Sequence, residues 1–61
     1  MCEFNVILNG KTVLKDVVYA KTDGNKVIVK NVLGEAKEIE NCMISEVNVN
    51  TTRLVLAESK P

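Results

Sequence analysis

The sequence predicts a small all-β domain, an antiparallel barrel or rolled sheet of about six short strands. Two observations predict it: apolar and polar residues alternate in short runs, and turn signals separate these runs at near-regular spacing. The chain has 61 residues, enough for one domain with a thin core. We expect this domain to span residues 1–57, followed by a polar C-terminal tail over residues 58–61.

The order of elements follows from these runs. Extended segments are expected over residues 3–8, 12–14, 17–22, 26–31, 36–40, 45–49 and 53–57. Between them, tight turns are predicted at residues 9–10, 23–25, 32–35 and 50–52, a bend or bulge at residues 15–16, and a connector with at most one helical turn at residues 41–45. Asn-Gly and Asp-Gly pairs between apolar runs are strong hairpin signals.

Apolar residues occupy both faces of the predicted strands. The face assigned to the core carries Phe4, Val6, Leu8, Tyr19, Val27, Val29, Val47, Val49, Leu54 and Leu56. The opposite face carries Ile7, Val18, Ala20, Ile28 and Val55. A half-buried strand should be polar on its second face, and a chain this short usually needs a partner, a metal or disulfides. We therefore expect a homodimer; burial of both faces in a tightly curled barrel, or scattered surface apolar residues, is the alternative.

Charge and composition limit the partners. Eight basic residues balance eight acidic ones, so nothing attracts the chain to phosphate backbones or anionic lipids at long range. Phe4 and Tyr19 are the two aromatic residues, whereas single-strand binders usually stack bases on several. These features argue against nucleic acid. No apolar run approaches a membrane span and no signal peptide is expected, so we expect a cytoplasmic protein with reduced thiols.

Little in the sequence suggests catalysis, and we expect the chain not to be an enzyme. It contains no His, the usual general base near neutral pH. Glu35, Glu38 and Glu40 cluster locally, but an acidic solvated strand edge offset by Lys37 explains them better than a cation site. Cys42 is expected to be a small buried residue, and Tyr19 a core residue with its hydroxyl at the rim.

Cys2 is the candidate metal ligand. The Cys2 thiolate lies within one or two covalent steps of the Met1 or Cys2 amine and the Cys2 amide nitrogen, so nitrogen and sulfur can close a chelate ring. Square-planar nitrogen and sulfur ligands suit Ni(II) or Cu(II). One chain supplies too few ligands to complete such a site, but two Cys2 residues meeting at a dimer axis would supply two nitrogens and two sulfurs.

The opening Met1–Leu8, the turn at Asp23–Val27 and the runs Ser45–Val49 and Arg53–Leu56 resemble the CooT family, small nickel-binding accessory proteins of carbon monoxide dehydrogenase maturation. The resemblance implies a homodimer of β domains that binds one Ni(II) between its subunits, with Cys2 as the essential ligand and Met1 as a candidate co-ligand. It also implies delivery of nickel to an apo-enzyme such as carbon monoxide dehydrogenase.

One alternative function remains open from the sequence. Small barrels often bind nucleic acid or peptides, and some CooT-like proteins have been labelled RNA-binding. A non-metal binding module, either an RNA-binding β-barrel or a protein adaptor, is therefore the second hypothesis. The RNA version predicts an affinity for single strands that falls steeply as the salt concentration rises.

Overall fold

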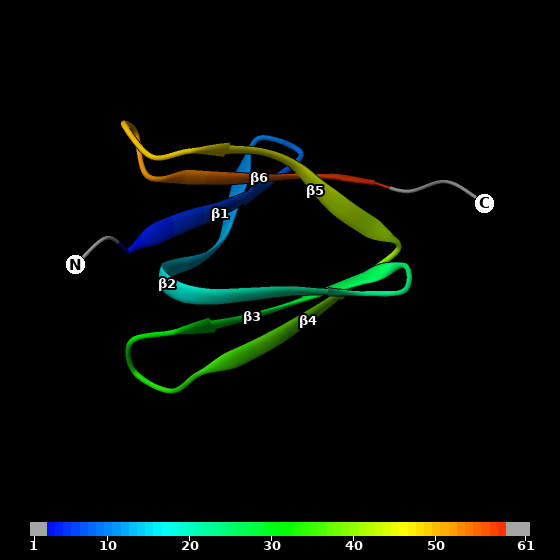
Figure 1. Ribbon diagram of the computed structural model, residues 1–61, viewed down its shortest axis with the longest axis horizontal. Helices are drawn as coiled ribbons and strands as arrows, with labels where there is room; N and C mark the ends of the chain where they lie inside the picture. Colours follow the sequence, from blue (N-terminus) through cyan, green and yellow to red (C-terminus); the bar gives the residue numbers. More distant parts are fainter. Residues whose placement is uncertain (1–2, 59–61) are drawn as a thin grey trace.

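The structure is a computed structural model that describes residues 3–58. Within these residues six strands form one sheet (Figure 1). They are β1 (Phe4–Leu8), β2 (Lys11–Asp23), β3 (Lys26–Asn31), β4 (Ala36–Glu40), β5 (Cys42–Asn48) and β6 (Arg53–Glu58). Across residues 3–58, no helix is long and apolar enough to span a membrane. The prediction of an all-β chain with six strands is confirmed, and the last three residues of the predicted tail lie outside the described range.

The two predicted tight turns in the N-terminal half are confirmed. Asn9 and Gly10 have φ values of 54° and 76°, the left-handed pair that a type I′ hairpin turn requires. Gly24 has a φ of 64° and, with Asn25, joins the paired residues Asp23 and Lys26. These turns set up the antiparallel pairs β1–β2 and β2–β3.

The predicted break at residues 15–16 does not end a strand, because β2 continues through it to Asp23. Between the pairs Phe4–Val17 and Val6–Leu14, β2 contains one residue more than β1, and Asp16 has a φ of 57°. This is a β-bulge, which bends a strand and increases its twist. β2 has two further extra residues: Val13 lies between the pairs Val6–Leu14 and Ile7–Thr12, and Val18 lies between the pairs Val17–Asn31 and Tyr19–Lys30. The predicted bulge is thus confirmed, but segments 12–14 and 17–22 form one long, bent strand.

The sheet is not closed into a barrel. Its order is β4-β3-β2-β1-β6-β5, so of the two expected forms, a barrel or a rolled sheet, the barrel was wrong. The antiparallel pairing was wrong at one place, because β1 pairs with β6 in parallel. The bent β2 places β2–β3–β4 opposite β1–β6–β5 (Figure 1). The connector expected at residues 41–45 was also wrong: Asn41, with a φ of 58°, makes the corner alone, and β5 starts at Cys42.

The core lies between these two halves of the sheet. Its buried hydrophobic residues are Val6, Ile7, Val17, Val27, Val29, Cys42, Leu54 and Leu56. Three residues assigned to the core from the sequence are instead exposed: Tyr19 (44%), Val47 (54%) and Val49 (62%). Ile7, assigned to the opposite face, is buried. The extra residue Val18 reverses the alternation of faces beyond it, which is why Tyr19 lies outside the core. Val47 does lie on the core side, opposite Leu54, but the sheet does not cover it, and Val49 lies beyond the end of β5.

A single buried amide holds the turn between β3 and β4. The Asn31 side chain is 7% exposed; its Oδ1 accepts hydrogen bonds from the backbone N–H groups of Leu33 (3.1 Å) and Glu35 (2.9 Å). Its Nδ2 donates to Glu35 Oε1 at 2.8 Å. The next residue, Val32, donates its N–H to the carbonyl of Asp16 at 2.9 Å. The turn is therefore tied to the bulge of β2.

We expect Asn31→Ala to lower the free energy of unfolding by about 2 kcal/mol, because two backbone donors lose their acceptor in a partly buried turn. The matched control is Asn25→Ala, which removes an exposed contact to Asn41 and should change stability by less than about 0.5 kcal/mol. Urea unfolding of the metal-free variants and the wild type, all at the same protein concentration, measures both changes in the free energy of unfolding. Equal losses in the two variants would contradict this role of Asn31.

Candidate metal centre and the open face of the sheet

The predicted ligands Met1 and Cys2 lie outside the described residues. The nearest described part of the chain is Glu3 and then Phe4, the first residue of β1. Phe4 pairs with Val17 of β2 at this end of the sheet. The sheet therefore anchors the chain two residues after the candidate ligand.

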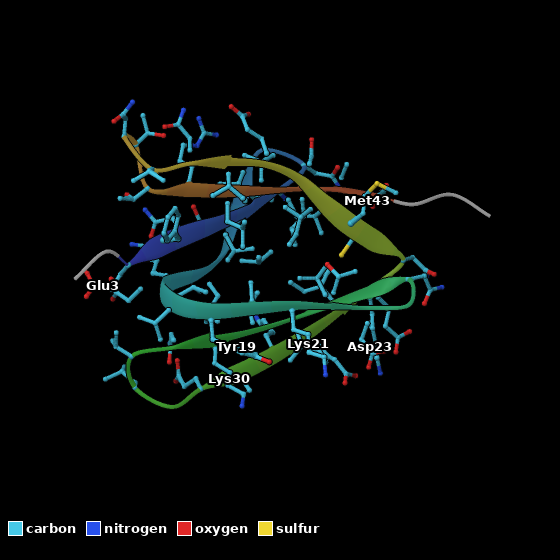
Figure 2. All side chains as sticks on the ribbon, in the orientation of Figure 1. Glu3, Tyr19, Lys21, Asp23, Lys30 and Met43 are labelled. Carbon is cyan, nitrogen blue, oxygen red and sulfur yellow. The ribbon has the colours of Figure 1, made fainter. Side chains whose placement is uncertain are left out.

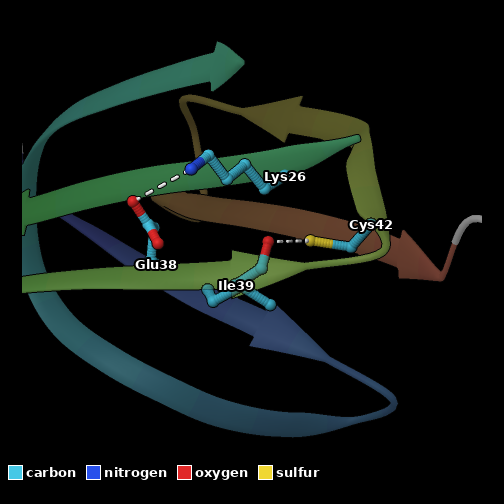
Figure 3. A network of polar contacts seen from close by, with 4 residues as sticks. All are labelled: Lys26, Glu38, Ile39 and Cys42. Atoms are coloured by element: carbon cyan, nitrogen blue, oxygen red, sulfur yellow. Dashed lines mark hydrogen bonds and ion pairs between the residues drawn. The ribbon is translucent and has the colours of Figure 1, made fainter. Parts of the chain in front are cut away.

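The other cysteine, Cys42, is built into the core. Its side chain is 1% exposed, and its thiol donates a hydrogen bond to the carbonyl oxygen of Ile39 at 3.2 Å (Figure 3). Burial raises the pKa of the Cys42 thiol above its ordinary value. A backbone hydrogen bond at Val27 lowers this pKa by less, and the nearby Glu58 carboxylate raises it by a still smaller amount. The thiolate is the form that binds metal and reacts as a nucleophile. Cys42 is therefore the small buried residue that the sequence predicts.

In a Cys2→Ala background, we expect Cys42 to be alkylated by iodoacetamide at pH 8 at least about 100-fold more slowly in the folded chain than in guanidinium chloride. Equal alkylation rates would show that the thiol is accessible.

The raised pKa of Cys42 also determines how stability depends on pH. The contribution of the protonated thiol to stability is complete below the thiol pKa of the unfolded chain, and it is lost as the pH rises through the pKa of the folded chain. Stability should thus fall more between pH 8 and 10 with Cys42 present than in Cys42→Ala.

The acidic cluster behaves as a solvated strand edge. Glu38 and Glu40 lie on β4, the outermost strand at one edge of the sheet, and both are exposed. Glu38 Oε2 pairs with Lys26 Nζ at 3.3 Å, and Lys37 Nζ donates to the carbonyl oxygen of Val13 at 3.1 Å. Over residues 3–58, no group of three or more His, Cys, Asp or Glu side chains is arranged to hold a metal.

Tyr19 is not the core residue expected from the sequence. It lies on the outer side of β2, with the Lys30 amine 5.1 Å from its ring centroid (Figure 2). The extra residue Val18 shifts the alternation of faces, and Tyr19 consequently pairs with Lys30, which is also exposed. This is a cation–π contact at an exposed site.

The structure also shows an apolar mouth that alternation of residues did not predict. This open mouth, as we call it, has a volume of about 310 Å³. It is lined by Phe4, Val17, Val18, Tyr19, Ala20, Ile44, Val47 and Leu54. The residues come from β1, β2, β5 and β6, so it opens between the two halves of the sheet. The excess of apolar residues on both faces was the one sequence signal for it.

Comparison with known proteins supports the resemblance noted from the sequence. The profile of the family described as "CO dehydrogenase accessory protein CooT" matches residues 1–57, which include Met1 and Cys2. The chain is also 30% identical over 56 residues to "Uncharacterized protein MJ1551" of Methanocaldococcus jannaschii; the match covers 92% of this chain and 96% of that protein. The family is defined by an accessory role rather than by catalysis. The chain therefore belongs to the CooT family of CO dehydrogenase accessory proteins.

Proposed function

We propose that this chain is a homodimeric nickel-binding accessory protein, which holds one Ni(II) as cargo between two subunits and passes it to a nickel enzyme such as CO dehydrogenase. The observation that carries the proposal is the family match over residues 1–57, because it includes the Met1-Cys2 opening. It also favours an accessory role over the RNA-binding or adaptor alternative.

The chemistry of the donors supports nickel as the cargo. The Cys2 thiolate and the neighbouring amine or amide nitrogens form a nitrogen–sulfur chelate, a combination that suits Ni(II) in square-planar geometry. A second chain supplies the other two ligands. The alternative thiol, Cys42, is buried and hydrogen-bonded to Ile39, and burial raises its pKa, so it is held in the protonated form that does not bind metal.

The test is a titration of untagged, reduced protein with Ni(II), followed by the thiolate-to-nickel absorption band. The account expects this band to grow linearly and to stop at about one metal per two chains, since two chains share one four-ligand site. Saturation at one metal per chain, or no thiolate band, would remove the proposed site. Intact mass measured on the same sample establishes whether Met1 is present, and therefore whether the terminal amine belongs to Met1 or to Cys2.

A further inference from the structure

The open mouth contains residues that point to the core side of the sheet but are not covered by it. Ala20 pairs with the buried Val29, and Val47 pairs with the buried Leu54, so each shares a face with a core residue. Yet Ala20 is exposed, and Val47 is 54% exposed. Val18, the extra residue of the bulge, is 46% exposed in the same mouth. Ala20 and Val47 therefore occupy core positions in a sheet that does not close over them.

Two of the four strands that line the open mouth, β5 and β2, have an unpaired backbone edge among the described residues. β5 is the last strand in the sheet order. β2 pairs with β1 only as far as Val17, so from Tyr19 to Asp23 it pairs with β3 alone. Exposed strand edges next to apolar side chains invite pairing with another chain. The mouth therefore offers both apolar side chains and free backbone groups to an occupant.

The charge of the chain indicates what that occupant is. All of the residues that line the mouth are apolar or tyrosine, and the chain carries equal numbers of acidic and basic residues. A polyanion gains nothing from such a surface. A second copy of a chain with zero net charge approaches without overall repulsion, and a net charge near zero favours association.

The thin core favours an occupant that stays in place. The buried hydrophobic residues of the described chain include no aromatic residue, and none is larger than leucine or isoleucine. A domain of this size is only marginally stable by itself. A client that leaves after each delivery would uncover the mouth each time, whereas a second copy covers it permanently.

We propose that the open mouth is the homodimer interface, in which a second copy places its own mouth against the first about a two-fold axis. The proposal rests on the homodimer of the proposed function and locates its contact surface. It also fits a site shared by two chains: Phe4, the first residue of β1, lines the mouth, so mouths that face each other bring the starts of both β1 strands to one interface.

The test compares two glutamate substitutions at apolar residues in metal-free protein. Val47→Glu places a carboxylate in the mouth of each copy, and we expect it to raise the dimer dissociation constant at least about 100-fold, because two buried like charges meet in the dimer. The matched control, Leu33→Glu, alters a residue that is 79% exposed on the turn between β3 and β4 and does not line the mouth. It should remain a dimer of twice 6.7 kDa.

Sedimentation equilibrium over a range of concentrations measures both constants, and circular dichroism verifies the β signal. If Val47→Glu does not fold, Ala20→Glu provides the same test from β2, where the residue is also exposed. Dimers that persist with wild-type affinity in the folded mouth variants overturn the proposal, as does a metal-free wild type that stays monomeric. If the chain's own terminal segments or another protein occupied the mouth instead, the metal-free wild type would be such a monomer.

Failure here is distinguishable from failure of the nickel site. If the mouth forms the interface, Cys2→Ala without metal remains a dimer with unchanged dissociation constant, whether or not nickel binds to the wild type. If instead nickel alone joins two chains, the wild type is a dimer only with metal and a monomer without it. That result would preserve the shared metal site but remove the apolar interface.

Discussion

Replacing Cys2 by alanine should abolish the thiolate-to-nickel band and lower the affinity for Ni(II) at least about 1,000-fold. Even the loss of an outer-shell partner of a metal ligand costs 10–100-fold in affinity, and a substitution in a homodimer removes two direct ligands at once. The soft sulfur donors are the ones that the remaining nitrogens cannot replace. Competition with a chromophoric chelator measures the change.

The matched control for Cys2→Ala is Cys42→Ala. It removes a thiol that is 1% exposed and hydrogen-bonded to the carbonyl of Ile39, so it should cost stability and leave the nickel affinity and the absorption band unchanged. Far-ultraviolet circular dichroism of both variants verifies that the sheet is intact. Retention of nickel by Cys2→Ala, or loss of nickel in a folded Cys42→Ala protein, would show that Cys2 is not the metal ligand.

The second large effect is release of nickel by acid. A metal-bound thiol must lose its proton, and so must an amine ligand, so affinity depends on pH below the pKa values of the ligands. Free thiols have a pKa of about 8.5 and terminal amines about 7.7–8.0. With two thiols and two amines on each nickel, the apparent affinity should fall about 10,000-fold per unit of pH below about pH 7.5.

The steepness of this pH dependence reports the number of ligands. Chelator competition at several pH values between 5.5 and 7.5 gives a slope of about four protons per nickel for a site shared by two chains. Two protons per nickel would indicate that one chain binds the metal by itself, which contradicts the proposed bridge. Cys42→Ala should give the same slope as the wild type.

The sequence was most informative about turns. Asn9-Gly10 and Gly24 each predicted a hairpin, and both positions adopt positive φ values. These signals are local, because a backbone in the left-handed region favours glycine and asparagine whatever surrounds it. The strand content of the chain followed from these turns together with the alternation of apolar and polar residues between them.

The faces of the strands were harder to predict, because they depend on bulges. Val18 shifts the register of β2 against β3, and Ser45 shifts that of β5 against β6; β2 has two more shifts against β1. Neither differs in type from its neighbours in a way that marks an irregular pair, and a bulge depends on which strand lies opposite. Beyond Val18, Tyr19 turns outward and Ala20 turns toward the core side. The parallel pairing of β1 with β6 is equally non-local and has no signal within either strand.

The candidate site also has one part that the sequence predicts and one part that it does not. The prediction that Cys2 is a metal ligand follows from its covalent neighbours and from the family resemblance, and neither requires knowledge of the tertiary structure. The open mouth depends on how β2 and β5 come to border one gap, and the sequence indicated only that apolar residues exceed what one face can bury. Asn31, whose side chain holds the turn between β3 and β4, had no distinguishing motif.

Native mass spectrometry of the untagged protein with limiting Ni(II) tests the central claim most directly. The account predicts that nickel appears only on species with the mass of two chains, with one nickel on each, beside metal-free dimers, and that this nickel is lost in Cys2→Ala. Nickel on a single chain, or two nickel ions on each dimer, would contradict a metal held between subunits.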